Sequence, residues 1–284
     1  MDKKLVLAVA GSGKTYYICQ MLVEDEKNLI LAFTHENIKN IRNEIIKRFG
    51  YIPEKTCILI FSAFLYRYIL FPYVFSITKF FNSNKHILGV ETSASPKPWI
   101  NGRYNSKYIK KEYIEHYISK DNKFYCDLMS ELALNTNDGD KSIAEKALEK
   151  LNCFFNKVLI DEVQDYRNND YNFLLKMYKY LDTIITVGDY YQHSVSGTNN
   201  TGIPFITGRG SKKKDITYTD YISNIEAEGI VVDTETLCKS RRCGGTICDL
   251  ISKKLKIPIN SANFTESEII KVDAASINSV LEND

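Results

Sequence analysis

The sequence predicts an α/β fold in which a parallel sheet carries helices on both faces and a helical insertion interrupts the alternation. Three observations predict it. A Gly-rich turn follows the first apolar run, short apolar runs alternate with amphipathic stretches, and two carboxylates end a later apolar run. At 284 residues the chain is near the upper size of a single core, so we expect two folding units or one with an insertion.

The first apolar run ends in a turn with the composition of a phosphate-binding loop. The turn consists of Ala10, Gly11, Ser12, Gly13, Lys14 and Thr15. Its small residues let backbone N–H groups surround a polyphosphate, while Lys14 supplies positive charge and Thr15 a hydroxyl for Mg²⁺. A helix expected from about Gly13 to Glu24 would point its positive end at the phosphates. A purely structural strand-to-helix turn is the alternative.

Strands and helices then alternate along the chain. Residues 28–33 predict a second strand, and isoleucines at helical spacing predict a helix that ends at Gly50. Residues 57–61 predict a third strand, followed by a helix to about Tyr73. The apolar stretch 58–81 includes charged residues and a proline, so it does not predict a membrane span.

A helical insertion is expected between about residues 76 and 150, where the alternation stops. Its predicted helices lie near 107–119, 123–134 and 142–155. The first of them mixes tyrosines with lysines, including Lys110 and Lys111, as suits a nucleic-acid surface. A solvated helix face with half-buried tyrosines is the alternative.

The sheet is expected to return at residues 157–160, which lead into Asp161 and Glu162. Open α/β sheets place their ligands at this end of the strands. One carboxylate can hold Mg²⁺ through water, and the next can orient or deprotonate an attacking water. A pair of exposed structural acids is the alternative.

The last third of the chain continues the pattern less regularly. A helix over about 170–180 leads to a strand at 182–187, after which Gln192 is placed to sense a terminal phosphate. Further predictions are a strand at 229–232, a helix at 237–254 and a final strand at 268–272.

Composition limits the function classes. The 37 basic and 35 acidic residues give a net charge of +2, so any nucleic-acid binding must come from local patches. Residues 212–214 form one basic run, for which a solvated turn is the simpler interpretation. The seven scattered cysteines are typical of reduced thiols, so we expect a cytoplasmic protein, and their spacing fits no zinc site.

Six segments, in order, resemble motifs of the UvrD/Rep-type superfamily 1 DNA helicases. They are residues 8–15, 33–37, 60–64, 158–165, 187–192 and 237–242. The most specific match is the pattern Asp-Glu-x-Gln-Asp, which begins at Asp161. The resemblance implies a P-loop NTPase with a RecA-like sheet that uses ATP and Mg²⁺.

The resemblance also implies roles at the phosphates. Lys14 and Thr15 would contact the β- and γ-phosphates and Mg²⁺, and Asp161 would bind the same ion. Glu162 would be the catalytic base. The residues facing the γ-phosphate would be Gln192 and Arg242.

Base and nucleic-acid contacts follow from the same resemblance. Arg241 stands where the family often has an aromatic over the adenine, and its planar guanidinium could stack there instead. The residues expected to contact single-stranded DNA are Phe33, Thr34, Ser62 and Phe64, together with Lys110 and Lys111.

The chain departs from the family in three places. It opens on the first strand without the upstream Gln motif that contacts adenine, it lacks the aromatic-Arg continuation after Gln192, and motifs V and VI are not found before Asp284. We therefore expect four parts: a RecA-like core at 1–75 and 151–235, the insertion at 76–150, and the start of an incomplete second RecA-like domain at 236–284.

Two functions remain open at this point. The first is the ATP-binding portion of a UvrD-like DNA helicase, weak alone because a second arginine is missing. The second is a nucleotide-dependent regulatory or assembly subunit, for example in phage defence or DNA repair, whose partner chain supplies the missing half. A P-loop kinase is disfavoured by the Asp-Glu-x-Gln-Asp pattern.

Overall fold

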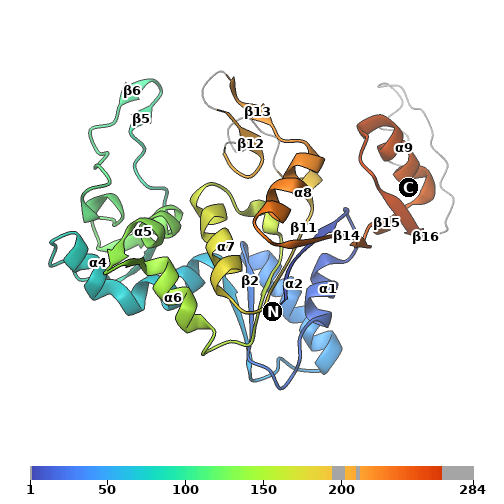
Figure 1. Cartoon of the computed structure of the whole chain (residues 1–284), viewed down its shortest axis with the longest axis horizontal. Coiled ribbons are helices and arrows are strands. Elements are labelled where there is room, and N and C mark those ends of the chain that lie inside the picture. Colours follow the sequence, from blue (N-terminus) through green and yellow to red (C-terminus); the bar gives the residue numbers. More distant parts are fainter. Residues whose placement is uncertain (1, 194–201, 209–211, 264–284) are drawn as a thin grey trace, which may run out of the picture.

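A six-stranded parallel sheet forms the centre of the computed structural model, which describes residues 2–193, 202–208 and 212–263. The strand order is β14-β1-β11-β10-β2-β3, and neighbouring strands are parallel throughout (Figure 1). The strands are β1 (Lys3–Ala8), β2 (Asn28–Ala32), β3 (Thr56–Ile60), β10 (Lys157–Ile160), β11 (Ile184–Gly188) and β14 (Val231–Leu237). The parallel sheet predicted from the sequence is confirmed.

Apolar side chains cover both faces of this sheet. Along β1, Leu5 and Leu7 belong to one core cluster, whereas Val6 and Ala8 belong to another. Alternate residues of a strand point to opposite faces, so the central strands are buried on both sides. This explains why the sequence shows continuous apolar runs here rather than alternation.

Helices lie on both faces, as predicted. One face carries α1 (Lys14–Gln20) and α2 (His35–Phe49), and the other carries α5 (Met129–Asn135), α6 (Ile143–Leu151), α7 (Asn169–Tyr180) and α8 (Tyr218–Ala227). Helix α2 ends at Gly50 in the left-handed conformation, with φ of 80°, as the sequence predicts. Helix α1 is shorter than predicted because the Asn28 amide donates to the carbonyls of Val23 and Glu26, at 2.8 Å each, and holds the following segment as a loop.

The segment after β3 is helical but irregular. It consists of α3 (Phe61–Phe64), a π-helix (Leu65–Leu70), a 3₁₀ turn (Phe71–Tyr73) and α4 (Val74–Phe80). The predicted helix to about Tyr73 is therefore a series of short helices. Pro72 lies at the start of the 3₁₀ turn, where a missing N–H is tolerated.

The insertion is less helical than predicted. The predicted helix over 107–119 is wrong, since this segment consists of turns and irregular backbone apart from one 3₁₀ turn at Ile114–His116. Similarly, the segment predicted as a helix from 123 starts as a strand. Short strands occupy the middle of the insertion: β4 (Gly89–Glu91), β5 (Trp99–Ile100), β6 (Arg103–Tyr104), β7 (Lys123–Tyr125), β8 (Asn137–Asp138) and β9 (Lys141–Ser142).

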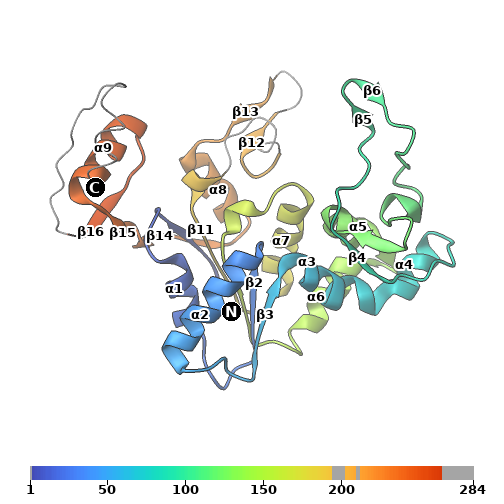
Figure 2. The ribbon, with the colours of Figure 1, turned by 180° about the vertical axis from the view of Figure 1, so that it is seen from behind.

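The chain after β11 differs from the prediction in several elements. Helix α8 was not predicted, and β14 extends beyond the strand predicted at 229–232. The predicted helix over 237–254 is wrong over residues 237–244, where β14 ends and β15 (Lys239–Gly244) follows before α9 (Gly245–Leu255). Strand β15 pairs in parallel with β16 (Asn260–Asn263), apart from the six-stranded sheet (Figure 2). The strand predicted at 268–272 lies outside the described residues.

The division into four parts stays a prediction. Insertion residues such as Phe124 and Leu148 belong to the same core cluster as Leu5 of the sheet, so the two share one apolar core. Within the described ranges, none of the helices combines the length and apolar character needed to cross a membrane.

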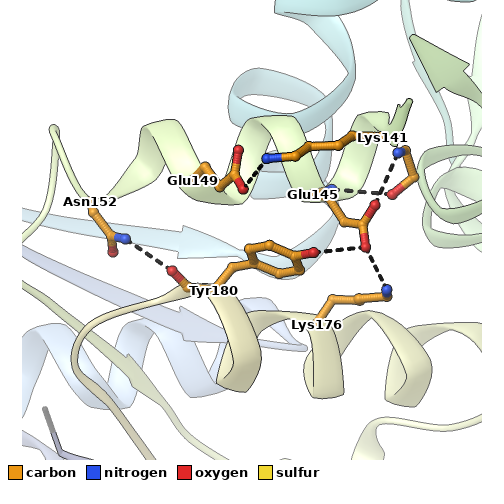
Figure 3. Close-up of polar contacts among 7 residues, drawn as sticks. Lys141, Glu145, Glu149, Asn152, Lys176 and Tyr180 are labelled. Atoms are coloured by element: carbon orange, nitrogen blue, oxygen red, sulfur yellow. Dashed lines mark hydrogen bonds and ion pairs between the residues drawn. The ribbon is translucent and has the colours of Figure 1, made fainter. Parts of the chain in front are cut away.

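Glu145 connects helices α6 and α7. Its carboxylate accepts hydrogen bonds from Lys176 Nζ at 2.7 Å and Tyr180 OH at 2.8 Å (Figure 3). It also completes a capping box with Ser142 at the start of α6. The Lys176 contact, followed by the bond from the Ser142 backbone, lowers the pKa of Glu145 to about 2.

We expect Glu145→Gln to lower the free energy of unfolding by about 1–2 kcal/mol at pH 7, since it removes the charge from these bonds. A depressed carboxyl pKa stabilises the folded state above the unfolded pKa, and this contribution is lost as pH falls from about 4.5 towards 2. Urea unfolding at pH 7 and pH 3 measures both effects. Glu149→Gln is the matched control, because its ion pair with Lys141 is 41% exposed on both sides and should contribute little to stability. Equal losses in the two variants would contradict the role of Glu145.

Candidate functional site

The phosphate-binding loop connects β1 to α1, as predicted. Gly11 and Gly13 adopt φ angles of 74° and 92°, which only glycine adopts without strain. A Cβ on Gly11 would lie 2.6 Å from the Cβ of Arg242 and 2.9 Å from the Ser240 hydroxyl. The Arg241 N–H also donates to the Gly11 carbonyl at 2.9 Å. The loop therefore needs glycine both for its own turn and for the close approach of β15.

The predicted metal-binding residues lie side by side. The Thr15 hydroxyl donates to Asp161 Oδ2 at 2.9 Å, although the two residues follow different strands. The other oxygen of Asp161 accepts the Glu162 N–H at 3.0 Å. Asp161 is only 1% exposed, and this burial raises the pKa of its carboxyl to about 6. An ionised carboxylate here is thus costly until a cation arrives.

The predicted base, Glu162, contacts the lysine of the loop. Its Oε2 lies 3.0 Å from Lys14 Nζ, and it accepts a hydrogen bond of 2.6 Å from Gln164 Nε2. Glu162 has a φ of 56°, a left-handed conformation that is uncommon for a residue with a side chain. Outliers of this kind concentrate at functional sites, where surrounding contacts hold them.

Gln192 completes the contacts of the loop lysine. Its Oε1 accepts a hydrogen bond of 3.1 Å from Lys14 Nζ. Asp189 holds the turn that presents it, because its carboxylate accepts the Tyr191 N–H at 2.9 Å at the start of the 3₁₀ turn Tyr190–Gln192. Lys14 is therefore held between two side chains that follow neighbouring strands, β10 and β11.

Gln164 is a site residue without a predicted role. It is 5% exposed, donates to Glu162, and accepts the Asp189 N–H at 3.0 Å. It thereby links the ends of β10 and β11. Its place in the Asp-Glu-x-Gln-Asp pattern is the signal that could have identified it.

A cavity of about 440 Å³ lies over these groups. Residues 11–16 of the loop, Glu162, Gln192 and Arg242 line one part of it. Helix α2 lines the rest with four polar residues, Asn40, Asn43, Glu44 and Lys47. They recur at intervals of three, one and three, so they share one helix face. The sequence prediction missed them because it considered only the apolar face of this helix.

A comparison with known protein families identifies the family of this chain. A family model described as an AAA domain matches residues 2–198, more than half of the chain. The chain belongs to the AAA domain family. The match places it among the P-loop NTP hydrolases of the helicase-type superfamily and confirms the predicted α/β P-loop fold class. None of the curated proteins matches the sequence.

The donor set of this AAA domain fits a nucleotide with Mg²⁺. Thr15 and Asp161 present hard oxygen ligands, which Mg²⁺ prefers together with water and phosphate oxygens. The described ranges contain no cluster of three or more His, Cys, Asp or Glu that could hold a metal ion alone. The Ser12 hydroxyl is buried without a hydrogen-bond partner in the described part of the chain, which leaves it free for a phosphate oxygen.

Arg241 and Arg242 take different positions in the AAA domain. The Arg242 side chain lines the cavity, whereas the Arg241 guanidinium lies 5.8 Å from the centroid of the Tyr16 ring. Tyr16 is 49% exposed and lines the same cavity. A cation over an aromatic face is a favourable arrangement at the rim of a nucleotide site. The stacking of Arg241 on a base stays a prediction.

The expected nucleic-acid residues differ in exposure. Phe64 is 0% exposed in the core, so its prediction as a DNA contact is wrong for this structure. Phe33 is half-buried and packs edge-on against Tyr166. Thr34 is exposed, but its hydroxyl caps α2 by accepting the Asn37 N–H. The other predicted contacts are half-buried Ser62, exposed Lys110, and exposed Lys111, which pairs with Glu131.

We expect Asp161→Asn to stabilise the nucleotide-free protein by about 1–3 kcal/mol at pH 7.5, as order of magnitude. A carboxyl pKa raised from 3.8 to about 6 means that ionisation opposes folding, so the cost is absent below about pH 4 and complete above pH 6. The gain in stability of the Asp161→Asn variant should therefore disappear at pH 4. Urea unfolding at the two pH values measures it.

The same variant should lose the stabilisation that Mg²⁺ and ATP give the wild type, measured by thermal unfolding. Asp182→Asn is the control for both experiments, since Asp182 lies exposed before β11. A destabilised Asp161→Asn protein at pH 7.5 would contradict the electrostatic cost of this carboxylate.

Proposed function

We propose that this chain is an Mg²⁺-dependent ATPase of the UvrD/Rep helicase type, which couples ATP turnover to binding of single-stranded DNA. The observation that carries the proposal is the position of Lys14, whose ammonium contacts both Glu162 and Gln192. Three groups that phosphoryl transfer needs thus converge from three strands: a phosphate-binding cation, a carboxylate base and a γ-phosphate sensor.

The contacts of Lys14 suggest how the site responds to nucleotide. Without a phosphate, the ammonium is neutralised by Glu162 at 3.0 Å. A triphosphate carries more negative charge than the Glu162 carboxylate. It would therefore replace Glu162 and Gln192 as the partners of the Lys14 ammonium. Glu162 is then free to act on water, while Gln164 still holds its carboxylate in place.

The chemistry proposed is attack of water on the γ-phosphorus. A new P–O bond forms to the water oxygen as the bond to the β–γ bridging oxygen breaks, and Glu162 accepts the proton that the water loses. Gln192 orients the water, and Lys14 stabilises the negative charge on the transferred group. When bound at Thr15 and Asp161, Mg²⁺ supplies further charge neutralisation.

Coupling to DNA is supported by the arrangement around β15. Strand β15 lies outside the six-stranded sheet, yet Arg242 reaches the nucleotide cavity and touches the loop at Gly11. Nucleotide in this cavity would therefore change the contacts between the sheet and the β15–α9–β16 unit. Movement between two such units is what a DNA motor requires.

A regulatory or assembly subunit is the second candidate. The burial of Phe64 and the packing of Phe33 favour it, since neither ring is presented for base stacking. In this case the nucleotide site would respond to a protein partner instead of DNA.

We expect Glu162→Gln to bind ATP with wild-type affinity while its kcat falls about 10²- to 10⁴-fold, because the variant lacks the proton acceptor. Equilibrium binding of a fluorescent ATP analogue and single-turnover hydrolysis measure the two quantities. Gln164→Ala is the comparison for a positioning role: a reduced kcat should be accompanied by a changed pH profile, since Glu162 loses its hydrogen bond. A Glu162→Gln protein that hydrolyses ATP at the wild-type rate would exclude Glu162 as the base.

Lys14→Ala should lose ATP binding, since the cation at the phosphates disappears. Lys47→Ala, on the α2 side of the same cavity, is the control and should weaken binding less. Unchanged affinity in Lys14→Ala would rule out the phosphate site.

The ATPase rate with and without single-stranded DNA separates the two functions. Stimulation by DNA supports the helicase-type ATPase. If DNA has no effect and a protein partner stimulates hydrolysis, the regulatory subunit is correct.

A further inference from the structure

The nucleotide site leaves one prominent feature unused: a projecting segment of the insertion, residues 92–111, here termed the arm. Its tip is the β5–β6 hairpin, in which Asn101 and Gly102 have φ angles of 50° and 75°. Two left-handed residues in succession are typical of the tight type I′ hairpin turn. Figures 1 and 2 show the arm extending away from the body of the fold, on the same side as the β12–β13 hairpin.

Polar contacts fix both ends of the arm. At its start, the Ser95 N–H and hydroxyl donate to Asp127 Oδ2 at 3.2 and 2.9 Å. At its end, Lys111 pairs with Glu131, which is 5% exposed, and the Ile109 carbonyl is bonded to the His116 ring at 2.6 Å. These contacts hold the hairpin in position before any partner arrives, which lowers the entropic cost of binding.

The arm is strongly basic. It contains five basic residues and no Asp or Glu, namely Lys97, Arg103, Lys107, Lys110 and Lys111. All five are exposed, and only Lys111 forms an ion pair among the residues that the structure describes. Uncompensated charge of one sign attracts a polyanion.

Two large aromatic side chains lie exposed at the tip. Trp99 and Tyr104 are opposite each other in the hairpin, 63% and 58% exposed, with ring centroids 5.7 Å apart at 81°. Other rings of this chain are equally exposed, such as Phe75 at 80%, but Trp99 and Tyr104 lie against each other on a segment rich in exposed cations. Aromatic faces next to cations are the arrangement on which unpaired bases stack.

We propose that the arm is a binding site for single-stranded DNA, with bases stacked on Trp99 and Tyr104 and phosphates on Lys97, Arg103 and Lys107. The inference rests on the proposed function, since it assigns the DNA contact to a specific surface. It replaces the predicted contacts at Phe33 and Phe64, which the fold uses for packing.

A second basic element lies on the same side. The β12–β13 hairpin pairs Ile206–Thr207 with Lys214–Asp215, and the exposed Lys212 and Lys213 precede its second strand. A strand held by the arm therefore has a second cationic contact available on that side. An acidic protein would also be attracted by the positive charge of the arm, but it would not use the ring faces of Trp99 and Tyr104.

Trp99 gives a direct measurement, because it is the only tryptophan of the chain. Oligo-dT should quench the tryptophan emission of the wild-type protein as bases stack on the ring. By anisotropy of a labelled oligo-dT, Trp99→Ala should bind about 5- to 150-fold more weakly, and Trp99→Phe should recover most of the affinity. Phe154→Ala is the matched control, since this exposed ring, at 57%, belongs to the segment after α6 rather than to the arm.

Salt dependence tests the phosphate contacts. Replacing Lys97, Arg103 and Lys107 with alanine should reduce the slope of log affinity against log salt by about 2. Each phosphate contact to a single strand contributes about 0.7 to this slope. The control replaces Lys27, Lys55 and Lys150, which are exposed away from the arm, and should leave the slope unchanged.

Failure of this inference differs from failure of the proposed function. DNA-stimulated ATPase with no tryptophan quenching and unchanged affinity in Trp99→Ala overturns the arm as the DNA site and leaves the ATPase intact. Quenching by oligo-dT without any ATPase activity supports the arm as a DNA site and overturns the proposed function.

Oligo-U of equal length distinguishes DNA from RNA: quenching by oligo-U alone overturns the assignment to DNA. Quenching by polyglutamate but not by either oligonucleotide overturns it in favour of an acidic protein partner.

Discussion

The contact between Thr15 and Asp161 depends on a constraint in the strand order. Thr15 follows β1 and Asp161 follows β10, but β11 lies between these strands. The segment after β10 must therefore pass over the end of β11. A Cβ on Gly188, the last residue of β11, would lie 2.5 Å from Val163 and 2.6 Å from Gln164. The absence of a side chain there lets Gln164 reach the Asp189 N–H and fixes the acids relative to the phosphate-binding loop.

This packing explains why the site is electrostatically incomplete without ligand. Asp161 is buried where its ionised form is costly, and Lys14 has the Glu162 carboxylate as its only described ion-pair partner. A cation at Asp161 would offset the cost of its ionised form, and phosphates at Lys14 would take the place of the Glu162 carboxylate. Binding of nucleotide with metal is thus coupled to the stability of this edge of the sheet, because each ligand compensates a charge that the fold has buried.

The sequence predicted the parts of the structure that follow from local pattern. Apolar runs identified all of the central strands except the full extent of β14, and the Gly-Lys-Thr turn identified the phosphate-binding loop. It failed where long-range contacts decide the conformation. Residues 107–119 have apolar residues at helical spacing, but Ile114, Tyr117 and Ile118 are buried around one 3₁₀ turn, and Lys111 pairs with the buried Glu131, which is distant in sequence. No local pattern reveals that partner.

Positive charge is concentrated on the arm of the insertion instead of being spread over the chain. The whole chain is nearly neutral, and the arm holds five of its 37 basic residues without an acid, so the remainder carries more acidic than basic residues. A polyanion approaching such a molecule is attracted at the arm and gains little elsewhere except at local basic runs such as residues 212–214. Salt lowers DNA affinity most where the protein contacts phosphates. A surface of this kind therefore binds DNA weakly at high ionic strength. The neutrality of the chain as a whole is therefore compatible with a DNA partner, because the charge that matters is concentrated on one preorganised arm.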